Sequence, residues 1–215
     1  MKNKKTYTHV IWDFNGTILD DVRLCIHCVN DMLEDRGLPV ISDEAAYREI
    51  FGFPIDDYYT RLGFDFHKED YDTVLAPEWV AKYLAGEGDC GTMPGVRETI
   101  AAIRTRGLEQ IVLSASNLTQ LRGQLERLGL LGEFREVIGL DNIHARSKKA
   151  QALEWMAAHP TAVPLFVGDT EHDAQVADAV GADCVLYTGG HQSERKLMAC
   201  GKPIISDIRE LLAFL

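Results

Sequence analysis

Short apolar segments alternate with helical stretches along most of this chain of 215 residues. Apolar segments bounded by turn residues are typical of buried strands, and we predict them at residues 8–14, 110–114, 136–139, 164–168 and 183–187. Between and after them, amphipathic spacing predicts helices near residues 95–106, 117–128, 147–159, 171–180 and 206–214. Repeated alternation of this kind predicts an α/β fold with a mostly parallel sheet and helices on both of its faces.

Residues 20–88 break the alternation, because they contain only helical patterns. Apolar residues recur at helical spacing from Val22 until Gly37 and Pro39 end the run. Further helices are predicted near 43–51, 55–62 and 68–85. A structureless connection of this length is improbable inside a compact domain. We therefore predict a helical domain at 20–88, inserted into a core formed by 1–19 and 89–215, with Gly86-Glu87-Gly88 as a hinge; extra helices packed rigidly on the sheet are the alternative.

Charge and cysteine content exclude several classes of partner. The formal net charge of −11 argues against binding to nucleic acid or to an anionic membrane. Neither a secretory signal nor an apolar stretch of the roughly 18 residues that a membrane helix needs is present, so we expect no membrane segment. Five cysteines without the spacing of a disulfide framework favour a reducing, cytoplasmic setting. Cys25 and Cys28 flank His27, and helical spacing predicts them as core residues rather than metal ligands.

Polar residues gather where the predicted strands end. Asp13 ends the first strand, Ser114 the second, and Asp169 with Asp173 follow the strand at 164–168. Lys148 begins a predicted helix just before that strand. Each residue alone has an ordinary explanation as a helix cap, a turn residue or a solvated charge. In parallel sheets, however, ligand sites lie beyond the carboxyl ends of the strands, so these side chains are expected to converge.

Converging carboxylates repel one another unless a cation neutralises them, and hard oxygen ligands suit Mg²⁺. A lysine and a hydroxyl beside that cation would complete a cradle for a phosphoryl group. A carboxylate in such a site is a candidate nucleophile, because carboxylates form aspartyl-phosphate intermediates. The pattern thus predicts phosphoryl chemistry at Asp13.

The sequences "DFNGT", "LSAS", "SK" and "GDTEHD", in this order, resemble the four motifs of the haloacid dehalogenase (HAD) superfamily. The helical insertion after the first motif resembles the C1 cap of its phosphoglycolate phosphatase-like and β-phosphoglucomutase-like members. The resemblance spans nearly the whole chain and implies a Rossmann-like core with an α-helical cap. It also implies a phosphatase that acts on a small phosphorylated metabolite. The oligomeric state cannot be inferred from these motifs.

The resemblance also implies a role for each motif residue. Asp13 would attack phosphorus and carry the phosphoryl group. Lys148 would reduce the repulsion between Asp13 and the phosphate. We prefer Lys148 to Lys149 because the pair "SK" stands where family members have their motif lysine. The implied Mg²⁺ ligands are Asp13, the backbone carbonyl of Asn15, Asp169 and, directly or through water, Asp173. The implied phosphate-binding residues are Ser114, Ala115, Gly16 and Lys148.

Asn15 departs from the family pattern, which usually has an aspartate two residues after the nucleophile. That acid protonates the leaving oxygen and then deprotonates water, whereas an amide cannot accept a proton from water. Loss of general acid–base catalysis typically costs about 10²–10⁴-fold in rate. Three interpretations follow: a slow phosphatase with a base such as His172, Glu171 or Asp20, a protein that only binds a phosphorylated ligand, or an engineered substitution at Asn15.

Other branches of the superfamily fit less well. The metal-free dehalogenases of the superfamily lack an acidic pair like Asp169 and Asp173. Phosphonate hydrolases use a lysine of the cap, and the sequence around Lys68 and Lys82 does not single out either lysine for this role. Response-regulator receivers, a different family, carry their acidic pair on the first strand and have no cap.

The stretch 51–59, with Phe53 and two tyrosines, either faces the substrate or packs inside the insertion. The possible anion contacts in the insertion are Arg23, Arg36, Arg48 and Arg61.

Overall fold

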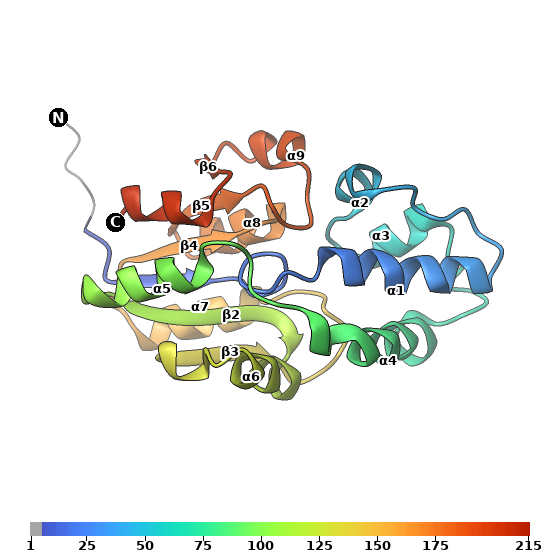
Figure 1. Ribbon diagram of the computed structural model, residues 1–215, viewed down its shortest axis with the longest axis horizontal. Helices are drawn as coiled ribbons and strands as arrows, with labels where there is room; N and C mark the ends of the chain where they lie inside the picture. Colours follow the sequence, from blue (N-terminus) through green and yellow to red (C-terminus); the bar gives the residue numbers. More distant parts are fainter. Residues whose placement is uncertain (1–5) are drawn as a thin grey trace.

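The structure, a computed structural model, describes residues 6–215. Within these residues, six parallel strands form one sheet in the order β3-β2-β1-β4-β5-β6 (Figure 1). The strands are β1 (His9–Trp12), β2 (Glu109–Asn117), β3 (Glu136–Leu140), β4 (Pro164–Gly168), β5 (Asp183–Tyr187) and β6 (Ile204–Ile205). The predicted α/β class with a parallel sheet is confirmed.

Strand β1 lies at the centre of the sheet, between β2 and β4. Its residue Ile11 is in register with Ile111 of β2 and Phe166 of β4. Val10 and Trp12 belong to the hydrophobic cluster on one face, while Ile11 belongs to the cluster on the other. A strand that is buried on both faces reads as a continuous apolar run, which explains the sequence that precedes Asp13.

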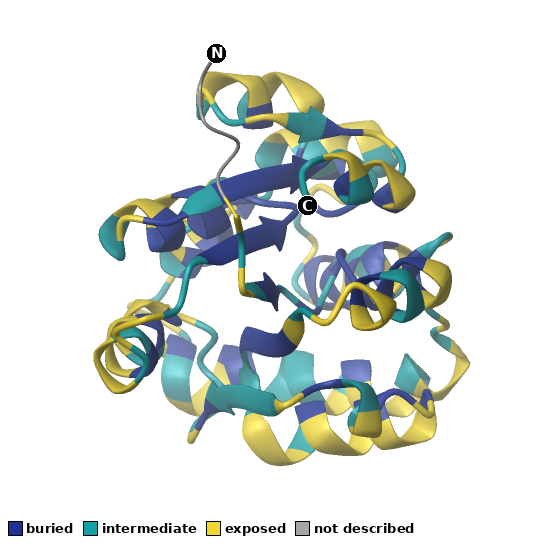
Figure 2. Ribbon diagram, turned by 90° about the vertical axis from the view of Figure 1, so that its left-hand side faces the viewer, coloured by how far each residue is buried: buried dark blue, intermediate teal, exposed yellow. Residues whose placement is uncertain are grey.

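Helices cover both faces of the sheet (Figures 1 and 2). Ile100, Leu121 and Ile208 pack in the cluster that contains Trp12, whereas Trp155 and Leu197 pack in the cluster that contains Ile11. The first face carries α5 (Val96–Thr105), α6 (Leu118–Arg127) and the 3₁₀ helix η4 (Ile208–Ala213), and the second carries α7 (Lys149–Ala158), α8 (Glu171–Ala179) and α9 (Glu194–Ala199). The exposed residues in Figure 2 lie mainly on the outer sides of these helices.

A separate group of helices follows β1 and lies beyond the carboxyl ends of the central strands (Figure 1). It comprises α1 (Val22–Asp35), α2 (Glu44–Ile50), α3 (Ile55–Leu62), the π-helical turn η1 (Tyr71–Leu75) and α4 (Ala76–Gly86). Helix α1 packs against α2 and α4. The 3₁₀ turn η2 (Glu87–Asp89) leads back to the core. The predicted helical insertion is therefore present, and it stands over the sheet edge where the site residues converge.

Several elements differ in detail from the sequence-based expectations. The helix expected at 68–85 is divided into η1 and α4, near Pro77, which has no backbone N–H to donate. The last predicted helix, 206–214, is the 3₁₀ helix η4. Strand β6 and helix α9 were not predicted, because two and six residues respectively are too short for a clear period. A further short 3₁₀ turn, η3 (Leu131–Glu133), precedes β3.

Cys25 and Cys28 of α1 pack in the hydrophobic core, as predicted. Cys25 and Cys28 are buried with free thiols, while His27 is exposed. Across residues 6–215, no helix combines the length and the apolar character needed to cross a membrane.

Candidate active site

Asp13 lies where β1 gives way to a tight turn at the sheet edge. Its backbone N–H still donates to Val167 of β4, at 2.9 Å, so the strand positions the residue rigidly. Gly16 of the same turn has φ +70°, and a Cβ there would collide with the His191 ring and the Asp169 carboxylate. Only glycine fits this close approach without strain. The turn thus allows β1 and the segment after β5 to meet.

Three carboxyl groups converge at this edge, the half-buried Asp13 and the buried Asp169 and Asp173, with oxygens within 4.8 Å of one another. Asp169 accepts hydrogen bonds from the Thr17 hydroxyl at 2.8 Å and from the His191 backbone N–H at 2.6 Å. Burial, together with the charges of the other two carboxylates, raises the pKa of Asp13 well above its usual value. The cluster therefore concentrates negative charge that needs compensation.

Lys148 supplies one positive charge to this cluster from the residue that precedes α7. Its ammonium group contacts the Asp13 carboxylate, lies 2.7 Å from Asp173 and donates to the Leu113 carbonyl at 3.0 Å. Burial acts to lower the pKa of Lys148, but the two carboxylates raise it above its usual value, so the side chain stays charged. The neighbouring Lys149 is exposed to solvent, in contrast to the buried Lys148.

Three carboxyl groups and one lysine leave the cluster with an excess of acidic groups. The carboxylate oxygens lie close together, and the pKa of Asp13 is raised by its surroundings. Clustered carboxylate oxygens are the ligands that a hard divalent cation prefers. The residues present therefore fit a divalent metal ion beside Asp13.

The predicted phosphate-binding residues are not all alike in position. Ser114 and Ala115, at the end of β2, line the cavity next to Asp13 and Lys148. The Gly16 N–H instead donates to the Leu19 carbonyl and to the Asp21 carboxylate, both at 3.0 Å. Gly16 therefore closes the turn in this structure, and its contact with phosphate stays a prediction.

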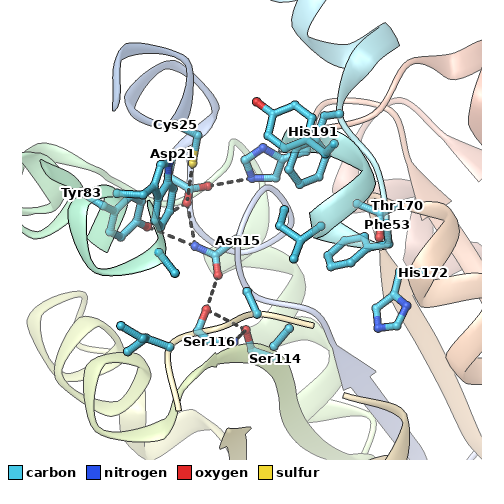
Figure 3. A pocket seen from close by; sticks show the side chains of 18 of the residues that line it. Asn15, Asp21, Cys25, Phe53, Tyr83, Ser114, Ser116, Thr170, His172 and His191 are labelled. Atoms are coloured by element: carbon cyan, nitrogen blue, oxygen red, sulfur yellow. Dashed lines mark hydrogen bonds and ion pairs between the residues drawn. The ribbon is translucent and has the colours of Figure 1, made fainter. Parts of the chain in front are cut away.

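Both polar atoms of the Asn15 side chain form hydrogen bonds (Figure 3). Its amide nitrogen donates to Asp21 at 2.7 Å and to the Tyr83 hydroxyl at 3.1 Å, which uses both of its hydrogens. Its amide oxygen accepts from the Ser116 hydroxyl at 2.7 Å. The amide therefore joins β2 to helix α4 and has no free donor for a leaving group.

Sequence reasoning missed the residues that hold Asn15. Asp21 is fully buried and contacts the His191 imidazole at 3.2 Å, and the other ring nitrogen of His191 lies 2.9 Å from the Tyr47 hydroxyl. Burial opposes the charged forms, yet the pairing lowers the pKa of Asp21 and raises the pKa of His191 to about 8. His191 follows the carboxyl end of β5, so reading that strand end as well would have indicated it.

The three residues proposed as a replacement base also differ in position. His172 lines the cavity and stacks on Phe53, with ring centroids 4.6 Å apart, and burial lowers its pKa. Asp20 is exposed, and neither it nor Glu171 lines the cavity. His172 is thus the one of the three with access to a ligand.

A cavity of about 160 Å³ lies between the carboxylate cluster and the helical insertion. Phe53, Tyr58 and Tyr59 line it, as the stretch 51–59 had suggested. Tyr58 and Tyr59 are also almost fully buried and contact each other edge to face, with centroids 5.6 Å apart. These tyrosines therefore pack inside the insertion and face the cavity at once.

Comparison with known proteins agrees with this arrangement. A protein-family model described as haloacid dehalogenase-like hydrolase matches residues 10–187. Phosphoglycolate phosphatase from Pseudomonas putida is 28% identical over 212 residues, which cover 94% of this chain and 78% of that protein. Phosphoglycolate phosphatase from Synechococcus elongatus is 27% identical over 195 residues, which cover 88% of each. A crystal structure of a predicted phosphatase from Clostridium acetobutylicum shares the fold, with a TM-score of 0.81, 19% identity and coverage of 96% of this chain and 97% of that one.

Proposed function

Because the chain belongs to the haloacid dehalogenase-like hydrolase family, we propose that it is a phosphatase that hydrolyses a small phosphate monoester through Asp13. The main support for the proposal is the position of Lys148, which is buried between Asp13 and Asp173 and lines the cavity. A buried lysine between two carboxylates is suited to an incoming dianion. The phosphoglycolate phosphatases similar to this chain support the same reaction class.

In the proposed reaction, a carboxylate oxygen of Asp13 forms a bond to phosphorus while the ester P–O bond breaks. The leaving oxygen takes a proton and departs as an alcohol. A water molecule then attacks phosphorus, gives up its proton, and releases inorganic phosphate as the Asp13 carboxylate is regenerated. Lys148 binds the phosphoryl oxygens and reduces repulsion between them and Asp13. Ser114 and the backbone of Ala115 orient the same oxygens.

Mg²⁺ is the cation we propose for the carboxylate cluster. Asp13, Asp169 and the backbone carbonyl of Asn15 would hold it, with Asp173 as a direct ligand or one that acts through water. When bound, the ion supplies positive charge that stabilises negative charge on the phosphoryl group. Thr17 and the His191 N–H hold Asp169 in place for this role.

Asn15 makes the proposed phosphatase slow. Its amide cannot exchange protons with the leaving oxygen or with water, and both of its N–H hydrogens are already engaged. The same observation favours a second candidate function, in which the protein binds a phosphorylated ligand and does not turn it over. The two candidates differ in whether any phosphate is released.

We also propose that residues 20–88 form the cap of a core made of 1–19 and 89–215. The contacts of α1 with α2 and α4, and the position of this group over the cavity, support the division. The free thiols of the five cysteines are compatible with the proposed reducing, cytoplasmic setting.

The test is a panel of small phosphate monoesters assayed for released phosphate in the presence of Mg²⁺. Wild-type protein is expected to turn over at least one ester, and Asp13→Asn is expected to release none. Asp35→Asn, on the exposed side of α1, is the matched control and should retain wild-type activity. Phosphate release by Asp13→Asn at the wild-type rate would contradict the role of Asp13. Binding of esters by a wild-type protein that releases no phosphate would favour the second candidate.

A further inference from the structure

The cavity has two ends with opposite chemistry. Asp13, Lys148 and Ser114 line one end, where the phosphoryl group is proposed to bind. The other end is formed by side chains of the insertion and of the loop before α7, and most of them are apolar. The apolar side chains that line this end include Phe51, Phe53, Ile55, Trp79, Val80 and Ile143. A leaving group attached to the phosphoryl oxygen must occupy this second end.

Positive charge is scarce along the whole cavity. Among residues 6–215, no arginine lines it, and its single lysine is Lys148, which already contacts two carboxylates. His191 is paired with Asp21, and the His172 ring stacks on Phe53. Within residues 6–215, no arginine and no second lysine faces the leaving-group end.

The arginines of the insertion have other partners. Arg36 lies between Glu69 and Glu78, at 2.7 and 2.6 Å, and Arg23 contacts Glu44 at 2.8 Å. Arg48 donates to the Gly189 carbonyl at 3.1 Å, and Arg61 donates to the Asp57 carbonyl at 3.2 Å. The four arginines considered as anion contacts therefore all lie outside the cavity lining.

A second negative charge on the substrate, located beyond the phosphoryl end, would meet a mostly apolar surface. Burying an unpaired charge against apolar groups is unfavourable by several kcal/mol. Aromatic and aliphatic surface instead favours apolar groups of matching size. The whole cavity, including the end assigned to the phosphoryl group, has a volume of about 160 Å³, so the apolar end suits only a small group.

We propose that the part of the substrate beyond the phosphoryl group is uncharged and apolar, as in a small alkyl or aryl phosphate monoester. This inference rests on the proposed function and deepens it. It separates the chain from phosphatases whose substrate carries a carboxylate next to the phosphate ester. The determinants are the side chains of Trp79, Val80 and Ile143, which present no charge to the leaving group.

Two matched substrate pairs isolate the effect of charge. 4-Carboxybenzyl phosphate has a carboxylate where benzyl phosphate has a ring hydrogen, and 2-phosphoglycolate has a carboxylate where ethyl phosphate has its methyl group. For the neutral member of each pair, kcat/KM is expected to be higher by at least about tenfold, since an unpaired buried charge costs more than 1.4 kcal/mol. Equal values, or a preference for the carboxylates, would overturn the inference.

Binding separates this inference from the proposed function. The Asp13→Asn variant with Mg²⁺ is titrated with each ester by calorimetry, which needs no turnover. Tighter binding of the neutral esters supports the inference even if wild-type protein releases no phosphate. If neither member of a pair binds, or if the carboxylates bind as tightly, the inference fails, whatever the result of the turnover assay.

A cation placed in the cavity should reverse the preference. Val80→Arg and, as an independent second variant, Ile143→Lys are expected to reduce the ratio between neutral and carboxylate esters to near one or below. Val40→Arg, at an exposed position of the insertion outside the cavity, is the matched control and should leave the ratio unchanged. Circular dichroism identifies folded variants, and an unchanged ratio in a folded cavity variant would contradict the assignment of these determinants.

Discussion

The amide nitrogen of Asn15 lies 2.7 Å from a carboxylate oxygen of Asp21 (Figure 3). This hydrogen bond determines which way the amide faces, so that its oxygen accepts from Ser116. Asp21 in turn contacts His191, and Tyr83 donates to Asp21 at 2.8 Å. The Asn15 amide is therefore part of a hydrogen-bond network that joins the core to the insertion.

Exchanging the acid and the amide tests this network. Asn15→Asp alone places a second carboxylate against Asp21, and like charges at hydrogen-bond distance should lower the Tm. The double variant Asn15→Asp/Asp21→Asn restores one acid and one amide, and it should recover most of the lost stability. It also supplies an acid at position 15, so kcat is expected to rise by at least about tenfold. Thermal melts and phosphate-release assays measure both effects.

Asp21→Asn alone is the control for this exchange, because it changes the network without adding an acid beside Asp13. It should not raise kcat. A double variant that is folded and no faster than wild type would show that the amide at Asn15 does not limit turnover.

Lys148 and Lys149 form a matched pair of neighbours, one buried in the carboxylate cluster and one exposed. Lys148→Met removes the positive charge that is proposed to bind the phosphoryl group, and kcat should fall by about 10²–10³-fold. Lys149→Met should remain within twofold of wild type, a difference of about 0.4 kcal/mol. Steady-state kinetics on one ester measures both variants, and equal losses in the two would contradict the role of Lys148.

Metal binding should be visible without any assay of activity. Saturating Mg²⁺ relieves repulsion among Asp13, Asp169 and Asp173, and is expected to raise the Tm by about 3–8 °C over protein in EDTA. The Asp169→Asn variant should lose most of this increase. Calorimetric scans measure it, and an equal shift in the variant would place the bound ion elsewhere.

The insertion has its own stabilising contact at Arg36. Its guanidinium lies between Glu69 and Glu78 and over the Phe64 ring, 5.4 Å from the centroid. Arg36→Met leaves the two glutamates facing each other, and the free energy of unfolding should fall by about 1–3 kcal/mol. Arg23→Met, at a side chain that is 90% exposed, should change it by less than about 0.5 kcal/mol. Urea denaturation compares the two.

The strand ends were predictable because a buried strand is visible as a short apolar run in the local sequence, and ligand sites in parallel sheets lie at the carboxyl ends of such strands. Asp13, Ser114 and Asp169 could be located in this way. Pairings across long sequence separations could not, since nothing near Asp21 indicates that His191, 170 positions later, contacts it. Likewise, the motif predicted a backbone contact at Gly16, but the competing acceptor on Asp21 becomes visible only in the folded turn.

The substrate surface was also only partly predictable. The aromatic stretch 51–59 indicated a candidate cap surface, but the position of each arginine depended on which glutamates folded beside it. Arg36 illustrates this, because its partners are 33 and 42 residues away. The absence of an arginine from the cavity lining of residues 6–215 is a property of the tertiary structure alone.

The central claim, that Asp13 carries the phosphoryl group, has one direct measurement. Protein is mixed with a phosphate ester and Mg²⁺, quenched in acid within the first turnover, digested, and analysed by mass spectrometry. We expect the added mass of one phosphoryl group on the peptide that contains Asp13, and no such species in the Asp13→Asn variant. Phosphate released during turnover with no phosphorylated peptide, or with the group on a different residue, would contradict it.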